Sequence, residues 1–180
     1  MKDVMVDLET MGSGPMAAII SIGAVEFDPV SGLIGESFYE VVNLTSSVEN
    51  GGIMDPDTVM WWLGQSGAAR LAVRTEAVSV ETALMRFGAW LSGCAPCNEL
   101  RVWGNGADFD NVILATAFDR AGIIRPWKFW NNRCYRTMKS LHKDVPLVRT
   151  GTHHNALDDA RTQAEHLIAI MAAAQIKKVA

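Results

Sequence analysis

The sequence predicts an α/β fold in which helices flank a sheet whose first three strands are antiparallel. Three apolar segments, residues 3–9, 18–27 and 36–42, come first and are separated by loops that contain Gly, Ser and Pro. These loops are shorter than the dozen or so residues that a parallel crossover needs, so they favour antiparallel pairing. From residue 55 onward, helical segments alternate with short strands, a pattern typical of α/β domains.

Length and composition agree with a single folded domain. The chain has 180 residues, of which 49% are hydrophobic and 20% charged, with a net charge of −4. We therefore expect one domain over residues 1–180. The apolar run at 167–174 is too short to span a bilayer, and residues 1–3 lack the pattern of a signal peptide. We expect a cytoplasmic protein with no membrane partner.

The first strand ends in two acidic residues, Asp7 and Glu9. Side chains two apart on a strand point to the same face, so these two carboxylates should lie side by side. Two adjacent carboxylates repel each other unless a cation or a proton sits between them. The pair is therefore the first indication of a metal site.

The middle of the chain predicts two helices. Asp55 and Pro56 open the first one as N-cap and first helical residue, and this helix carries Trp61 and Trp62. Tandem tryptophans favour packing, although one of them could stack on a nucleobase. Ser79 caps the second helix, which we expect to run to Leu91 and to end at Gly93, with an apolar stripe on one side.

In the second half, acidic residues recur where strands end and helices begin. A strand at 100–103 leads through a turn to a helix at 110–121, with Asp108 and Asp110 at the junction. Open α/β sheets place ligand sites just past the carboxyl ends of their strands. We expect a fifth strand at 128–135, a short helix at 137–142 and a long last helix over about 154–175. The start of that helix carries His153, His154, Asp158 and Asp159.

A basic segment separates the second and third acidic sites. Residues 125–149 contain seven basic residues and one acidic residue, Asp144. The segment therefore has a charge of about +6 and the rest of the chain about −10. The basic residues are Arg125, Lys128, Arg133, Arg136, Lys139, Lys143 and Arg149. A basic surface beside an acidic pocket suits a polyanionic substrate whose cleavage needs metal ions. Pairing with the protein's own acids is the alternative.

Carboxylates that converge from three places predict a two-metal centre. Four carboxylates in one pocket would be neutralised by two Mg²⁺ or Mn²⁺ ions, which prefer hard oxygen ligands. Paired ions about 3.5–4 Å apart cleave phosphodiesters, because one activates the attacking water and both stabilise charge on the phosphate. A histidine near the ions can take the proton of that water.

Three short motifs resemble those of the DEDDh 3′–5′ exonucleases, a superfamily that includes ribonuclease T and oligoribonuclease. They are Asp7-Leu8-Glu9-Thr10, Asn105-Gly106-Ala107-Asp108-Phe109-Asp110 and His154-Asn155-Ala156-Leu157-Asp158-Asp159. The resemblance implies a ribonuclease H-like fold with a mixed five-stranded sheet. The segment 61–66 further resembles the tryptophan-rich segment of the exonuclease VIII-like and small mycobacterial exoribonuclease-like branch.

Two duplications leave alternatives in the motifs. In the second motif, the family pattern of an aromatic residue followed by the metal-binding Asp selects Asp110, although Asp108 stays open. In the third, both His153 with Asp158 and His154 with Asp159 have the family spacing. The family motif His-x-Ala-Leu-x-Asp favours His154 with Asp159.

The resemblance then implies a metal-dependent 3′–5′ exonuclease that releases nucleoside 5′-monophosphates from RNA or DNA. Its metal ligands would be Asp7, Glu9, Asp110 and Asp159, its general base His154, and its substrate-binding residues Thr10, Met11, Trp61 and Asn105. The partner would be the 3′ end of a single strand, and a homodimer is common among free-standing relatives. The alternatives are a catalytically weak ribonuclease H-like binding module and a ribonuclease H-like endonuclease.

Overall fold

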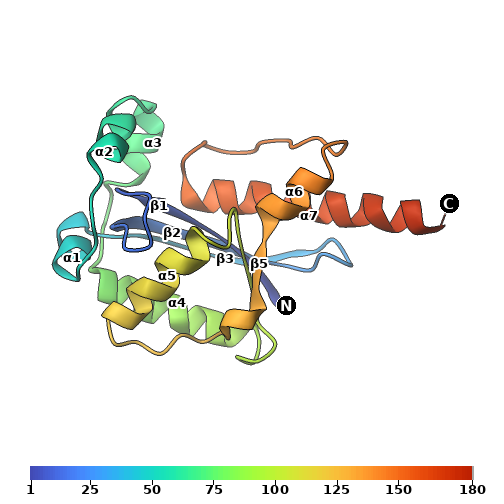
Figure 1. Ribbon diagram of the computed structural model, residues 1–180, viewed down its shortest axis with the longest axis horizontal. Helices are drawn as coiled ribbons and strands as arrows, with labels where there is room; N and C mark the ends of the chain where they lie inside the picture. Colours follow the sequence, from blue (N-terminus) through green and yellow to red (C-terminus); the bar gives the residue numbers. More distant parts are fainter. Residues whose placement is uncertain (180) are drawn as a thin grey trace.

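The computed structural model describes residues 1–179, with side chains described as far as Ala174. Within this range the strands form one mixed five-stranded sheet in the order β3-β2-β1-β4-β5 (Figure 1). The strands are β1 Asp3–Thr10, β2 Ile19–Phe27, β3 Ile34–Val41, β4 Arg101–Gly104 and β5 Asn132–Cys134. The first three are antiparallel, as predicted, whereas β4 runs parallel to β1 and β5 parallel to β4.

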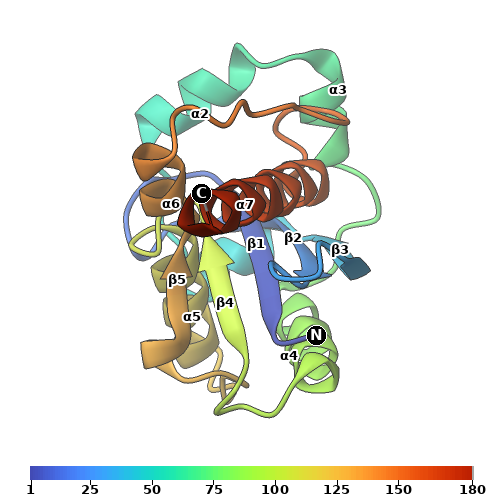
Figure 2. The ribbon, with the colours of Figure 1, turned by 90° about the vertical axis from the view of Figure 1, so that its right-hand side faces the viewer.

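Helices cover both faces of this sheet (Figure 2). They are α1 Leu44–Glu49, α2 Pro56–Leu63, α3 Gly67–Ala72, α4 Val80–Cys94, α5 Asp110–Arg120, α6 Tyr135–Leu141 and α7 Ala156–Val179. Among the described residues, none of these helices is long and apolar enough to cross a membrane.

The structure corrects several predicted boundaries. The fifth strand, expected at 128–135, is confined to Asn132–Cys134, because Phe129–Asn131 form a 3₁₀ turn, η1. Helix α4 does not end at Gly93 but continues to Cys94. The last helix begins at Ala156 rather than near 154, and the short helices α1 and α3 have no counterpart in the prediction. Short helices carry little periodicity, which explains why they were missed.

Strand β1 is buried on both faces because each face meets a different helical layer. Its even-numbered residues, Val4, Val6 and Leu8, belong to one core with α4 and α5. Its odd-numbered face begins with Met5, which packs in a second core with α6 and α7. Asp7 and Glu9 continue this second face by alternation.

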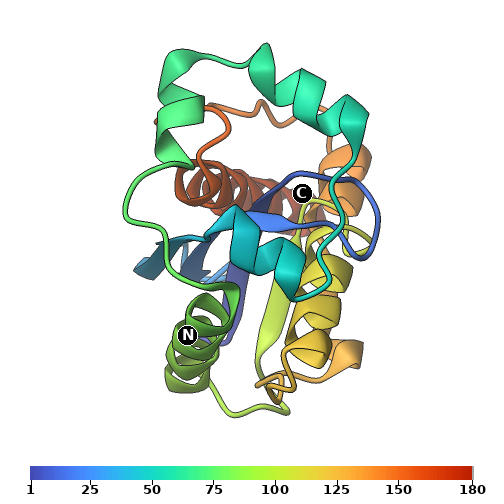
Figure 3. The same ribbon diagram turned by 90° about the vertical axis from the view of Figure 1, so that its left-hand side faces the viewer.

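A single glycine brings α7 onto the sheet. Gly23 of β2 pairs with Asp7 of β1, and a Cβ at Gly23 would lie only 2.1 Å from the carbonyl carbon of Ala156. The first turn of α7 can therefore touch β2 only because this position has no side chain. Helices α2 and α3 and the segment 142–155 lie beyond the end of the sheet that meets the first turn of α7 (Figure 3).

Candidate active site

A cleft of about 310 Å³ opens beyond the carboxyl end of β1. Its walls come from β1, α2, the loop after β4, α6, the segment before α7, and the first turns of α7. Parts of the chain that are far apart in sequence thus meet at one end of the central strand, the position where α/β sheets usually bind ligands.

Three carboxylates meet at the bottom of this cleft. Ligand atoms of Asp7, Glu9 and Asp159 all lie within 4.8 Å of one another. Strand alternation places Asp7 and Glu9 on the same face of β1, and the first turn of α7 brings Asp159 over them.

The fourth carboxylate, Asp110, does not line the cleft, but it lies close enough for its charge to raise the pKa of Asp7 and of Glu9. It is the first residue of α5 and is 2% exposed. Its Oδ1 accepts a hydrogen bond from the Leu8 amide at 3.2 Å, and its Oδ2 accepts one from the Asn105 amide at 2.9 Å. The alternative residue, Asp108, is exposed, and its charge is not among those that raise the pKa values of Asp7 and Glu9. The structure therefore joins Asp110 to the carboxylate cluster, the name used below for Asp7, Glu9, Asp110 and Asp159.

Electrostatics in the carboxylate cluster oppose ionisation. Burial, followed by the charges of Asp110, Glu9 and Asp159, raises the pKa of Asp7 well above its ordinary value. Burial and the neighbouring acids raise the pKa of Glu9 to about 8, and burial raises that of Asp110 to about 7. The Oε1 atom of Glu9 is buried and has no hydrogen-bond partner among the described residues.

These observations fit a divalent cation. An unpartnered buried carboxylate oxygen is costly unless an ion or a proton completes its surroundings. The donor set of the carboxylate cluster consists of oxygens alone, which suits Mg²⁺ or Mn²⁺ better than softer metals.

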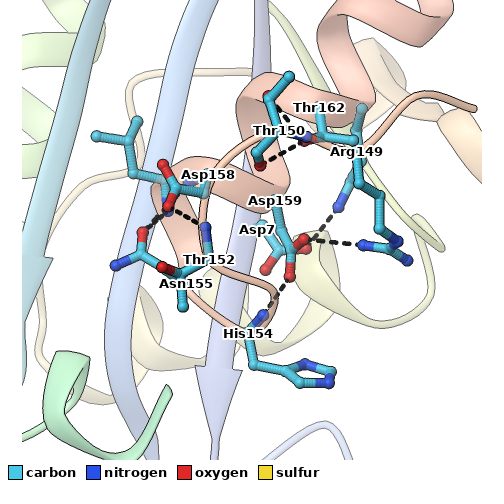
Figure 4. A network of polar contacts seen from close by, with 11 residues as sticks. Asp7, Arg149, Thr150, Thr152, His154, Asn155, Asp158, Asp159 and Thr162 are labelled. Carbon is cyan, nitrogen blue, oxygen red and sulfur yellow. Dashed lines mark hydrogen bonds and ion pairs between the residues drawn. The ribbon is translucent and has the colours of Figure 1, made fainter. Parts of the chain in front are cut away.

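Three hydrogen bonds hold the carboxylate cluster in place from α7 and the segment before it. The Gln163 Nε2 donates to Asp7 Oδ1 at 2.7 Å. Figure 4 shows the other two, in which Arg149 Nη1 and the backbone amide of His154 donate to the two oxygens of Asp159, at 3.1 and 2.9 Å. The sequence assigned no role to Gln163, and it predicted Arg149 only as part of the basic segment that would meet a polyanionic substrate. Gln163 lies one helical turn after Asp159, a spacing that could have drawn attention to it.

His154 adopts an uncommon backbone conformation directly before α7. Its φ of 63° lies in the left-handed region, which few residues other than glycine adopt. Its ring meets Trp61 edge-on with centroids 4.8 Å apart, and stacks on His153 at 3.7 Å. Ligand atoms of both histidines and Asp159 lie within 4.8 Å of one another. Burial and the neighbouring His153 lower the pKa of His154.

The neighbouring acid, Asp158, has a different environment. Its Oδ2 accepts a hydrogen bond from the Thr152 amide at 2.7 Å, which fastens the turn before α7 (Figure 4). Of the two His–Asp pairs that the sequence allows, only the pair with Asp159 has its acid on the cleft.

The substrate-binding residues expected from the sequence divide into two groups. Thr10, Trp61 and Asn105 line the cleft. Met11 does not; it packs beside Trp62 in a small satellite core. The two tryptophans have separate roles, because Trp62 is 4% exposed and donates from Nε1 to the Thr10 carbonyl, whereas Trp61 is 45% exposed.

The basic segment is also divided. Lys139 and Arg149 line the cleft, and Arg136 donates to the Asn105 carbonyl at 2.6 Å. At the other end of β5, Arg125 pairs with Asp119. Only part of the segment is thus placed to meet a ligand in the cleft.

A mixed ribonuclease H-like sheet with clustered carboxylates on its first strand, and a histidine ahead of its last helix, defines the DEDDh class of 3′–5′ exonucleases. A family model, the 3′–5′ exoribonuclease Rv2179c-like domain, matches residues 2–171. The chain belongs to this family, and the resemblance seen in the sequence is confirmed. The protein is therefore an enzyme, a 3′–5′ exonuclease of the DEDDh type.

Individual relatives agree with this assignment. An exodeoxyribonuclease of Enterobacteria phage T4 is 30% identical over 161 residues, which cover 76% of this chain and 70% of the relative. The nuclease domain of 3′hExo, a DEDDh family member bound to rAMP, has a TM-score of 0.62 at 14% identity and covers 95% of this chain and 92% of its own. E. coli exonuclease I in complex with an oligonucleotide also has a TM-score of 0.62 at 14% identity, over 96% of this chain and 40% of its own. The structural likenesses confirm the predicted fold.

Proposed function

We propose that this exonuclease degrades single-stranded nucleic acid from its 3′ end by a two-metal mechanism and releases nucleoside 5′-monophosphates. One observation carries the proposal: the carboxylates of Asp7, Glu9 and Asp159 converge within 4.8 Å, at an energetic cost that bound cations would offset. Stability alone gives no reason to keep such a group.

The residues of the carboxylate cluster are the proposed ligands of two Mg²⁺ or Mn²⁺ ions. Such ions, when bound, supply a nucleophilic water at neutral pH and neutralise charge on the phosphate. The chain itself holds the ligands still. Asp110 is fixed by two backbone amides and Asp7 by Gln163, so neither carboxylate has to reorganise when a cation arrives.

His154 is the proposed general base. Its lowered pKa keeps the imidazole neutral near pH 7, the form that can accept a proton from the attacking water. The hydrogen bond from its backbone amide to Asp159 ties the base to the carboxylate cluster. The ring can therefore move by rotation of its own side chain while its backbone stays fixed.

The cleft walls are the proposed binding site for the terminal nucleotide. Trp61 offers an exposed aromatic ring beside His154, and Thr10 and Asn105 add polar residues to the lining of the cleft. Lys139 and Arg149 line the same cleft and can pair with the phosphates of the strand. These contacts suit a single strand whose end is unpaired, because aromatic groups must reach the bases.

Matched 5′-labelled RNA and DNA strands, single and double, test this proposal with Mg²⁺ or Mn²⁺. We expect a ladder that shortens by one nucleotide at a time, with nucleoside 5′-monophosphates as products. The family is described as exoribonuclease and the phage relative as exodeoxyribonuclease, so the two sugars must be compared directly. Immediate internal fragments would indicate an endonuclease, and binding without release would indicate a binding module; either result would refute the proposal.

A further inference from the structure

An exposed patch of aromatic, aliphatic and basic side chains lies on the segment that precedes β5. This segment enters β5 at the end opposite to α6 (Figure 1), and α6 is one of the helices that line the cleft. We call the patch the distal patch; it consists of Ile124, Arg125, Lys128, Phe129 and Trp130. Its apolar members are 92% exposed at Ile124, 70% at Phe129 and 59% at Trp130, and they border a hollow of about 580 Å³. Contiguous exposed apolar side chains usually mark an interaction site.

The distal patch combines aromatic rings with cations. Lys128 Nζ lies 6.0 Å from the centroid of the Trp130 ring, and the Phe129 and Trp130 rings meet edge-on at 5.0 Å. The Arg125 guanidinium lies 5.9 Å from the Trp127 ring, with its charge offset by Asp119. Proteins bind single-stranded nucleic acid with this combination, because bases stack on the rings while cations follow the backbone.

A polyanionic strand fits this chemistry better than a second copy of the chain. Protein–protein interface cores are depleted in lysine, whereas here Lys128 stands over the exposed Trp130 ring. Residues 125–149 carry a charge of about +6 in a protein whose net charge is −4, so the positive charge that complements nucleic acid is concentrated in this segment.

Further cations connect the distal patch to the cleft. Arg133 lies on β5 directly after η1, and its Nη1 donates to the Trp130 carbonyl. Helix α6 follows β5 and carries Arg136, which donates to Asn105, and Lys139, which lines the cleft. Strand β5 and helix α6 thus present basic side chains along the way from one site to the other.

We propose that the distal patch is a second contact site for single-stranded nucleic acid, which holds nucleotides upstream while the 3′ end occupies the cleft. This proposal extends the proposed exonuclease function and rests on it. It predicts that long strands are bound more tightly than short ones, with the difference supplied by Phe129, Trp130 and Lys128.

The test compares cleavage of a single strand of about 16 nucleotides, the upper site size of single-strand-binding domains, with cleavage of a dinucleotide. Phe129→Ala/Trp130→Ala should raise KM for the long strand roughly tenfold, within the range measured for loss of base stacking. Lys128→Ala should raise it less. Neither variant should change kcat/KM for the dinucleotide, which reaches only the cleft.

Two controls accompany the kinetics. Val30→Ala removes a side chain that is 73% exposed in the turn before β3, at the opposite edge of the sheet, and should leave both substrates unaffected. Fluorescence anisotropy of the long strand without metal measures binding independently of cleavage, and here too the double variant should bind more weakly.

If the wild type cleaved neither substrate, the proposed function would fail while the anisotropy still tested the distal patch. Equal affinity and equal KM in wild type and double variant, or a loss of self-association alone, would overturn the proposal.

Discussion

The carboxylate cluster and the side chains above it are built in opposite ways. The cluster residues sit on β1, α5 and α7 and are mostly buried, and hydrogen bonds hold Asp7, Asp110 and Asp159 in place. The rim of the cleft, by which we mean Trp61, Arg149, His153 and His154, is more exposed and comes from α2 and the segment before α7. The cluster is thus rigid and electrostatically unfavourable, whereas the rim is open and adjustable.

This difference matches two separate functions, the binding of cations and the handling of the substrate. Carboxylates that must hold cations benefit from fixed positions, because no reorganisation is needed when the cation binds. Groups that contact a moving strand or a reacting water need freedom to rotate and to release the product. We therefore expect changes in the carboxylate cluster to affect metal binding and stability, and changes in the rim to affect rate and substrate affinity.

Replacement of Asp110 should have the largest effect on activity. Asp110→Asn keeps the shape of the side chain but removes a charge from the carboxylate cluster. We expect the Mn²⁺-dependent rate to fall by roughly a thousandfold or more, beyond the 10–100-fold typical of residues outside the ligand shell. Single-turnover cleavage of a labelled strand measures this. Asp108→Asn is the matched control and should remain near wild type; a loss in Asp108→Asn alone would show that the second motif is assigned to the wrong residue.

Replacement of His154 should slow the reaction while metal binding is kept. His154→Asn is the suitable variant, because asparagine tolerates the left-handed backbone at this position. The expected loss is about 100-fold, at the lower end of the range for a general base. Calorimetry with Mn²⁺ should give a dissociation constant close to that of the wild type.

The neighbouring residue provides the comparison for His154. His153→Asn removes the ring that stacks on His154 but leaves the proposed base in place. A rate close to wild type is expected. If His153→Asn were the slower enzyme, the assignment of the base to His154 would be wrong.

Metal should stabilise the protein, most of all at higher pH. At a cation concentration about 100 times the dissociation constant, the melting temperature should rise by about 5–10 °C in a chain of this size. The reason is the repulsion within the carboxylate cluster, which the cation removes. Thermal unfolding with and without saturating Mn²⁺ measures the shift, and an unchanged melting temperature would contradict the proposed metal site.

The pH dependence of the metal-free protein follows from the raised pKa values. Glu9 has an ordinary pKa of 4.5 and a folded pKa of about 8, and Asp110 changes from 3.8 to about 7. Between these values the unfolded chain has released its protons and the folded chain has kept them, so the free energy of unfolding falls as pH rises. We expect the melting temperature to decline from about pH 4 to about pH 8, and Glu9→Gln to flatten this decline.

Replacement of Arg149 should have the smallest effect. It should strengthen the binding of metal and weaken the binding of substrate. Arg149 is half exposed, so its ion pair with Asp159 is screened by solvent and weak. Arg149→Gln removes a cation that competes for Asp159, so Mn²⁺ should bind roughly two- to fivefold more tightly. KM for a strand should rise, because a phosphate partner is lost. Calorimetry and steady-state kinetics test the two effects separately, and weaker Mn²⁺ binding would contradict the competition.

Local rules in the sequence were sufficient for all five strands, for the longer helices and for half of the carboxylate cluster. Alternation along a strand depends only on neighbouring residues, so Asp7 and Glu9 could be placed on one face of β1 before the fold was known. The N-cap at Asp55 and the antiparallel order of the first three strands are equally local, and both are found in the structure. The 3₁₀ turn before β5 was missed because such turns lack a clear periodicity.

Tertiary structure decided which of two nearby acidic residues joins the carboxylate cluster. Asp108 precedes α5 and Asp110 begins it, whereas Asp158 and Asp159 both lie in the first turn of α7. Sequence spacing alone allows either member of each pair. The choice follows from long-range contacts: Leu8 binds Asp110 across 102 residues, and the close approach of Ala156 to Gly23 fixes the rotation of α7. Packing of the segment before α7 likewise brings Arg149 to Asp159. The sequence by itself determined the chemistry available to this protein, whereas distant contacts selected the side chains that share one cleft.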